Sequence, residues 1–346
     1  MEFIKPNTNF DFVGKRKIAY GVSISLILLS IFSLVFHGGP KYGIDFAGGT
    51  IIQVKFPTSV VTENIKSGLA GMGLVNTTIQ TFGDPREFEY LIRTDKPVQT
   101  TDTFSQQVKN SIKQATGTEP DIRRIEMVGP QVGKDLQEKA LFAIYYSMLF
   151  IAIYISGRFD FRWIACAVIA AALMGSVYLL SQWHISMAIL TAIALIITLV
   201  LFWILNLKYA MGAIVALIHD VVITVGCFSL FGKEFSLPII AAVLSIMGYS
   251  LNDTIIVYDR IRENLHKYPK NTLGITINRS VNETLSRTIL TSGLTLLAVV
   301  SLFIFGGGII HDFALAMLVG IVVGTYSSIY VASPILMAWQ DAGKKK

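Results

Sequence analysis

The sequence predicts a polytopic α-helical membrane protein that carries one extracytoplasmic α+β domain. Hydrophobic residues make up 53% of the 346 residues and charged residues only 15%, and the mean hydropathy is +0.58. A soluble domain of this length usually carries fewer apolar residues and more charged ones. Eight apolar stretches approach the roughly 20 residues that cross a bilayer as a helix. They lie at about 18–37, 140–156, 163–181, 186–206, 210–231, 236–258, 288–306 and 313–338.

A long polar segment separates the first two apolar stretches and defines the domain organisation. We expect an N-terminal tail and first membrane helix, an extracytoplasmic domain, a membrane helix bundle with an additional hairpin at about 163–206, and a basic cytoplasmic tail. Their boundaries are 1–37, 38–138, 139–338 and 339–346. The first helix is predicted to be an uncleaved anchor, because a His-Gly-Gly-Pro turn follows it and no Ala-x-Ala-like cleavage site does.

The lysines and arginines near the helix ends predict the orientation. With the N-terminus in the cytoplasm, the short inside segments hold residues 15–17, Arg158, Arg162, Lys208, the basic residues of 260–287 and the lysines of 344–346. The short outside loops hold only Lys233. Basic residues favour the cytoplasmic side, so the large polar segment is predicted to face outward.

The outer segment has the pattern of a small α+β domain. Periodicity and turn residues predict the order β-α-β-β-α-β, which is the ferredoxin-like arrangement. The strands are expected at 50–56, 76–82, 87–93 and 122–128, and the helices at 60–72 and 103–115. No group of residues with metal-ligand spacing occurs in this segment, nor does a nucleophile with a nearby base. We therefore expect a binding or mechanical module without cofactor, metal or catalytic residues.

Charge, cysteine content and motifs narrow the function further. The net charge of +6 is explained by the inside loops, so no nucleic-acid partner is needed. Both cysteines, Cys166 and Cys227, lie within apolar stretches and do not indicate a disulfide. No Gly-rich Walker loop for nucleotide binding is present.

Two carboxylates inside apolar helices are the strongest functional candidates. Asp220 and Asp253 each lie several residues inside a predicted helix, where an ionised carboxylate costs roughly 2.5–3.5 kcal/mol on insertion scales. For Asp253 we expect proton transfer rather than a purely structural protonated state, since Tyr249 and Asn252 supply a polar strip able to hold water. His219 and Asp220 either set helix packing or admit protons from one side.

The start of the following helix offers a partner for Asp253. Arg287 is expected to lie in the inner third of the membrane and to meet Asp253. A guanidinium favours the ionised carboxylate and burial favours the neutral one, so a small shift in packing would switch Asp253 between proton release and binding. Thr288, Thr291 and Ser292 either hold waters that connect the pair or pack the helices tightly.

Three further patterns are predicted to be structural. Asp45 is expected to cap a turn between the first membrane helix and the first strand, with a bend allowed by Gly48 and Gly49. The motif that contains them comprises Gly43, Asp45, Phe46, Gly48, Gly49 and Thr50. The charges at 259–263 are expected to be solvated interfacial anchors. Apolar residues at every fourth position of 273–285 predict a short helix lying on the inner membrane surface.

Several motifs, in order along the chain, resemble the SecD/SecF family of protein-export subunits. GIDFAGGT at 43–50 resembles the signature that opens the outer domain in this family, and RIEMVGPQVG at 124–133 resembles the end of that domain. Four motifs resemble the SecF branch: ALIHD at 216–220, GYSLND at 248–253, DRIREN at 259–264 and RTILTS at 287–292.

This resemblance implies a multi-pass subunit of the bacterial cytoplasmic (inner) membrane, related to the resistance-nodulation-division transporters. Such a subunit pairs with SecD beside the SecYEG channel. Proton flow through the membrane part is thought to move the outer domains and so help pull exported polypeptides across. The resemblance assigns proton movement to Asp253 and Arg287.

The predicted helix count departs from that family. SecF usually has six membrane helices, and the two additional ones here lie at 163–181 and 186–206. An even number of extra crossings keeps every later loop on its usual side. Faint similarity to 208–237 makes duplication of a hairpin one explanation, and the extra copy, which lacks a His-Asp pair, would then serve packing.

Two rival functions are less consistent with the sequence. An intramembrane aspartyl protease also uses two carboxylates, but such enzymes carry a Gly-x-Gly-Asp motif that this chain lacks, and Asp220 and Asp253 lie at different depths. The other alternative is a proton-coupled efflux transporter half of the resistance-nodulation-division type. Those pumps usually carry two large outer domains in one chain, and this chain has one.

Overall fold

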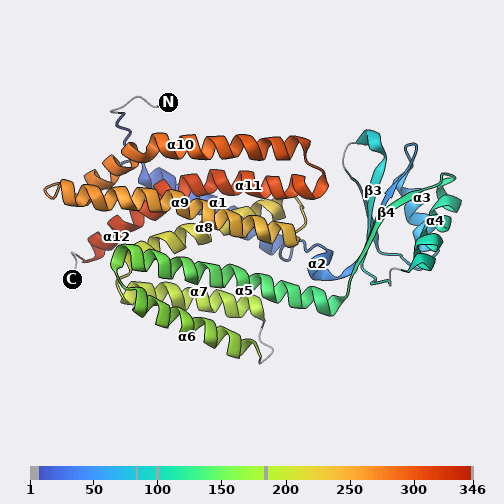
Figure 1. Ribbon diagram of the computed structural model, residues 1–346, viewed down its shortest axis with the longest axis horizontal. Coiled ribbons are helices and arrows are strands. Elements are labelled where there is room, and N and C mark those ends of the chain that lie inside the picture. The colour runs from blue at the N-terminus through green and yellow to red at the C-terminus, as the bar shows by residue number, and fades with distance from the viewer. Residues whose placement is uncertain (1–7, 83–84, 99–100, 183–185, 344–346) are drawn as a thin grey trace.

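The computed structural model describes residues 8–82, 85–98, 101–182 and 186–343. Residues 183–185, at the turn of the predicted extra hairpin, and the tail lysines 344–346 lie outside this part of the chain. A helical bundle forms the larger part of the molecule and a small sheet domain projects from one of its ends (Figure 1). We call this end of the bundle the sheet end and the opposite one, where the described chain both starts and finishes, the distal end.

Eight helices among the described residues are long and apolar enough to cross a membrane, which confirms the predicted number. The bounds of the first seven are α1 (Arg16–Phe36), α5 (Pro130–Ile155), α6 (Trp163–Ser181), α7 (Met187–Ile204), α8 (Lys208–Leu230), α9 (Leu237–Lys267) and α10 (Leu273–Phe305). The eighth span begins with α11 (Gly308–Ser327) and passes through a π-helical turn at Ser328–Ala332 into α12 (Ser333–Gly343).

The helices α8 and α9 lie at the centre of the bundle. Of the most apolar window of each helix, 61% is buried in α8 and 50% in α9, against 22% in α1 and α6. Their buried apolar residues form one continuous core with residues of α5, α10 and the π-helical turn. The two helices that carry the intramembrane carboxylates are therefore the best shielded from the surroundings.

Two helices begin earlier than the sequence predicted. The helix α5 starts at Pro130, a residue favoured in a first helical turn, so residues 130–138 belong to this helix. The predicted short surface helix at 273–285 is wrong, because these residues are the first turns of one continuous helix, α10. Its apolar positions Ile277, Val281 and Leu285 are buried against the bundle, and no helix-breaking proline separates them from the rest of α10.

The sheet domain consists of four antiparallel strands with the spatial order β2-β3-β1-β4. Along the chain its elements are β1 (Gly49–Lys55), α3 (Thr62–Ala70), β2 (Thr77–Thr81), a 3₁₀ turn (Pro85–Glu87), β3 (Glu89–Thr94), α4 (Asp102–Thr116) and β4 (Asp121–Val128). Alternate residues of β1 and β3, among them Ile52, Val54 and Ile92, are buried with residues of α3 and α4. The two helices cover the face of the sheet that points away from the bundle (Figure 1).

Two covalent links join the sheet domain to the bundle. The short helix α2 (Ile44–Ala47) leads from α1 into β1, and Gly129 leads from β4 into α5. The hairpin of α6 and α7 packs beside α5 at the edge of the bundle (Figure 1), around the buried residues Tyr145, Leu173 and Leu190.

Candidate functional site

Two carboxylates lie in the interior of the bundle, one on each central helix. Asp220 on α8 is 0% exposed and Asp253 on α9 is 1% exposed. A buried carboxylate is normally compensated by hydrogen-bond donors. The two carboxylates differ in how many hydrogen-bond donors their surroundings provide.

Both oxygens of the Asp220 carboxylate have polar partners. Ser250 of α9 donates to its Oδ2 over 2.6 Å, and Ser327 of α11 donates to the same atom over 2.9 Å. Its Oδ1 lies 2.9 Å from His219 Nδ1. The other ring nitrogen of His219 lies 3.2 Å from the Ser23 hydroxyl of α1. Asp220 therefore joins four helices through one buried polar network.

The carboxylate of Asp253 is only half satisfied. Ser292 of α10 donates to its Oδ2 over 3.3 Å. Its other oxygen, Oδ1, is buried and has no hydrogen-bond partner among the described residues, and the same holds for the nearby buried hydroxyl of Thr288. The Ser292 hydroxyl also lies 2.8 Å from that of Thr325 on α11.

The two polar groups approach each other along α9 and α11. Ser250, which binds Asp220, precedes Asp253 by three residues on α9, so it lies about one turn away on the same face. On α11, Thr325 contacts the Asp253 group and Ser327 contacts the Asp220 group. The π-helical turn begins directly afterwards at Ser328, and such turns occur frequently at functional sites.

The structure brings together only part of the predicted site. Ser292 contacts Asp253, and Thr288 is buried on the same helix. Arg287 is exposed, and no ion pair joins it to Asp253 in the described part of the chain. The predicted direct meeting of the two side chains is therefore not present in this structure.

The other residues predicted for the Asp253 site do not contact its carboxylate. Asn252 is exposed. Tyr249 donates to Thr295 over 3.4 Å, and Thr291 donates to the backbone oxygen of Arg287 over 3.0 Å. The polar strip expected on one face of α9 is thus not formed by Tyr249 and Asn252. The residues that do contact the carboxylates, Ser250 and Ser327, were missed because serine is also common where membrane helices pack closely.

The glycine-rich motif forms the junction between sheet domain and bundle. Asp45 does not cap its own turn; its Oδ2 accepts from the backbone N–H of Leu237 over 2.9 Å, and it therefore caps the first turn of α9. Gly48 and Gly49 have φ angles of 76° and 123°, which favour glycine. A Cβ at Gly49 would also overlap the carbonyl of Thr94.

The remaining residues of this motif contact both the bundle and the sheet domain. Gly43 donates to the carbonyl of Phe235 over 2.8 Å, and Phe46 is buried in the bundle core. Thr50 donates to the Lys96 carbonyl over 2.8 Å and so closes the loop after β3. The motif is thus a rigid connection rather than a loose linker.

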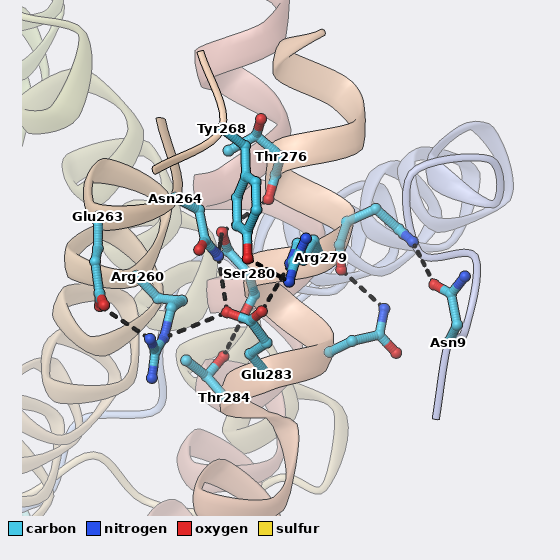
Figure 2. Close-up of polar contacts among 12 residues, drawn as sticks. Asn9, Arg260, Glu263, Asn264, Tyr268, Thr276, Arg279, Ser280, Glu283 and Thr284 are labelled. Atoms are coloured by element: carbon cyan, nitrogen blue, oxygen red, sulfur yellow. Dashed lines mark hydrogen bonds and ion pairs between the residues drawn. The ribbon is translucent and has the colours of Figure 1, made fainter. Parts of the chain in front are cut away.

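A polar cluster closes the α9–α10 hairpin at the distal end (Figure 2). Glu283 accepts from Arg279 and from the buried amide of Asn264, both over 2.8 Å, and its Oε2 lies 3.6 Å from Arg260. Arg260 also pairs with Glu263 over 2.9 Å. Of the charges predicted at 259–263, Arg260 thus reaches across the hairpin to α10.

Comparisons with known proteins identify the family. The family model "Protein export membrane protein SecD/SecF, C-terminal" matches residues 107–181 and 179–342, and the model "SecD/SecF GG Motif" matches residues 33–60. A protein translocase subunit SecF from Magnetococcus marinus is 41% identical over 100% of this chain and 97% of the relative. The chain belongs to the SecF family of protein translocase subunits. It is thus a subunit of the Sec protein-export machinery, and the efflux alternative is not favoured.

Other SecF relatives and two solved structures agree with this assignment. A SecF subunit from Vibrio alginolyticus is 38% identical over 97% of this chain and 91% of the relative. A crystal structure of SecDF, a translocon-associated membrane protein from Thermus thermophilus, matches with a TM-score of 0.69 and 30% identity. A super-membrane-facing form of SecDF matches with a TM-score of 0.57 and 31% identity. This chain is covered to 97% and 100%, but it spans only 39% and 40% of those chains.

Proposed function

We propose that this SecF-family chain, together with a membrane-embedded SecD partner, uses the proton gradient to assist export of polypeptides through the SecYEG channel. Asp253 is the proton-carrying group. The observation that carries this assignment is that Asp253 is buried while one of its oxygens has no hydrogen-bond partner among the described residues. An ionised carboxylate is poorly compensated in such a place, and a protonated one is favoured by the apolar surroundings.

The hydroxyl of Ser292 provides a switch between the two states. It lies within hydrogen-bond distance of both Asp253 and Thr325, and a hydroxyl has a single proton to donate. When Asp253 is ionised, Ser292 donates to it. When Asp253 binds a proton, the Ser292 hydroxyl is free to donate to Thr325 of α11 instead of accepting from it, so protonation reverses the direction of the hydrogen bond between α10 and α11.

Arg287 and Asp220 have supporting roles in this proposal. Arg287 is exposed in this structure, and its guanidinium favours the ionised form of Asp253 when a shift in helix packing brings the two side chains together. Asp220 has all of its near donors in place, so it serves to hold α8, α9 and α11 in register. His219 and Ser23 extend this network to α1. The α6–α7 hairpin serves packing beside α5.

The sheet domain is assigned a mechanical role on the extracytoplasmic side of the cytoplasmic (inner) membrane. Its element order and its strand order β2-β3-β1-β4 support a ferredoxin-like module. No group of three or more potential metal ligands occurs among the described residues of the chain. We infer that the domain acts by moving against the exported polypeptide rather than by chemistry.

Export into membrane vesicles tests the proposed function. Vesicles that contain SecYEG, SecD and this chain should export a reporter faster when a proton gradient is imposed, because Asp253 then binds and releases protons. Vesicles that lack only this chain should not respond. An equal response of both vesicle types would contradict the proposal.

The sidedness is testable with single cysteines at exposed positions. Gln106 lies on α4 of the sheet domain, and Lys270 lies in the α9–α10 turn at the distal end. In cells with a permeabilised outer membrane, an impermeant thiol reagent should label Gln106→Cys and should leave Lys270→Cys unlabelled until the inner membrane is opened. The reverse pattern would overturn the orientation.

A further inference from the structure

The loop between α8 and α9 is bonded to the sheet domain in addition to the two covalent links. Phe235 in this loop donates its N–H to the Lys41 carbonyl over 2.7 Å and accepts from the Gly43 N–H over 2.8 Å. Tyr42 and Phe235 form a parallel β-bridge. The loop is therefore attached by backbone hydrogen bonds to the segment that leads into β1.

Glu234, the residue before Phe235, extends this attachment into the sheet itself. Its carboxylate pairs with Arg93 of β3, and it lies 3.7 Å from Lys41. The side chains of Glu234 and Arg93 are 16% and 23% exposed, whereas that of Lys41 is 53% exposed. An ion pair that is largely shielded from water is stronger and less screened by salt than an exposed one. The pair with Arg93 is thus the stronger of the two.

This third attachment holds a part of the sheet that the two covalent links do not reach. The links connect the bundle to the sheet domain through α2 into β1 and through Gly129 from β4 into α5. The ion pair reaches β3, a strand that neither link enters. The angle of the sheet domain therefore depends on the position of the α8–α9 loop.

The same loop joins the two helices that carry the buried carboxylates. Asp220 lies on α8 and Asp253 on α9, and the bond from Ser250 to Asp220 ties these helices together within the bundle. The N-terminal turn of α9 is held by Asp45. A movement of α8 and α9 as one unit is therefore passed to Glu234 at the loop and from there to β3.

We propose that Glu234 is a positioning residue that couples proton binding in the bundle to the orientation of the sheet domain through its ion pair with Arg93. This inference rests on the proposed function. To that function it adds one specific contact, between the α8–α9 loop and β3, through which movement of the bundle reaches the sheet.

The test is a double-mutant cycle in the vesicle export assay with the complete complex. Glu234→Gln and Arg93→Gln should each lower the gradient-dependent part of export at least about fivefold, the low end of typical coupling between two sites. The double variant should lose no more than either single variant, because residues that act as one pair are not additive. Arg93→Lys keeps the charge and should retain most of the response, and Lys41→Gln is the matched control with little loss.

A second readout separates coupling from simple stabilisation. Nitroxide labels at Gln106 on α4 and Phe305 at the end of α10, both exposed, report the angle of the sheet domain after replacement of the native cysteines by alanine. The label distance should change between neutral and acidic buffer in the otherwise unaltered chain and should stay constant in Glu234→Gln. A full export response of Glu234→Gln, or losses that multiply in the double variant, would overturn the inference. Absence of a response with the unaltered chain would instead contradict the proposed function.

Discussion

Asp253→Asn is expected to remove the gradient-dependent part of export, by more than about tenfold, while the chain still assembles with its membrane partner. The amide occupies the same volume and still accepts from Ser292, but it cannot take up or release a proton at physiological pH. Because the carboxylate of Asp253 makes one side-chain hydrogen bond among the described residues, its replacement removes few contacts. Export into vesicles with and without an imposed gradient, together with co-purification of SecD, measures both properties.

Two further variants test whether the effect of Asp253→Asn comes from the loss of a titratable group. Asp253→Glu keeps a titratable group and should retain part of the response. Asn252→Ala is the matched control, because its exposed side chain neighbours Asp253 on the same helix, and it should respond like the unaltered chain. A normal response of Asp253→Asn would reduce Asp253 to a packing residue.

Asp220→Leu is expected to destabilise the bundle strongly, by about 3–5 kcal/mol, because it leaves several buried polar groups without their acceptor at about 1–3 kcal/mol each. The substitution leaves Ser250, Ser327 and His219 without their acceptor. Asp220→Asn keeps one acceptor oxygen and should cost only about 1–3 kcal/mol. Thermal unfolding in mild detergent measures the order of the two variants.

The comparison with Asp253 provides the control for this prediction. Asp253→Asn should unfold at nearly the same temperature as the unaltered chain, because it loses little hydrogen bonding. Equal stability of Asp220→Leu and the unaltered chain would contradict the structural role that we assign to Asp220.

The lengths of the apolar stretches predicted the number of membrane helices, but not the residues at which each helix begins and ends. All eight spans follow from hydropathy because a bilayer requires helices of a set length. The extension of α10 back to Leu273 depends on contacts with the rest of the bundle, since Ile277 and Val281 are buried there. An amphipathic pattern alone cannot separate burial against protein from burial at a membrane surface.

The carboxylates were found from the sequence together with Ser292 and His219, whereas their partners Ser250 and Ser327 were not. Aspartate is so costly inside an apolar helix that its position alone marks a residue with a specific functional or structural role. Arg287 and Ser292 were both expected near Asp253, but five residues on a helix correspond to a rotation of about 140°. They cannot face one carboxylate equally, and it is Ser292 that makes the contact. Asp45 was expected to act locally, yet its partner Leu237 lies far away in the chain.

The measurement that tests the central claim most directly is the protonation of Asp253 itself. Infrared difference spectra of the chain in lipid vesicles, recorded between acidic and neutral buffer, report carboxyl groups that change their proton occupancy. The account predicts a carboxylic acid band that is present in the unaltered chain, absent in Asp253→Asn and retained in Asp220→Asn. A band that persists unchanged in Asp253→Asn would show that another group carries the proton.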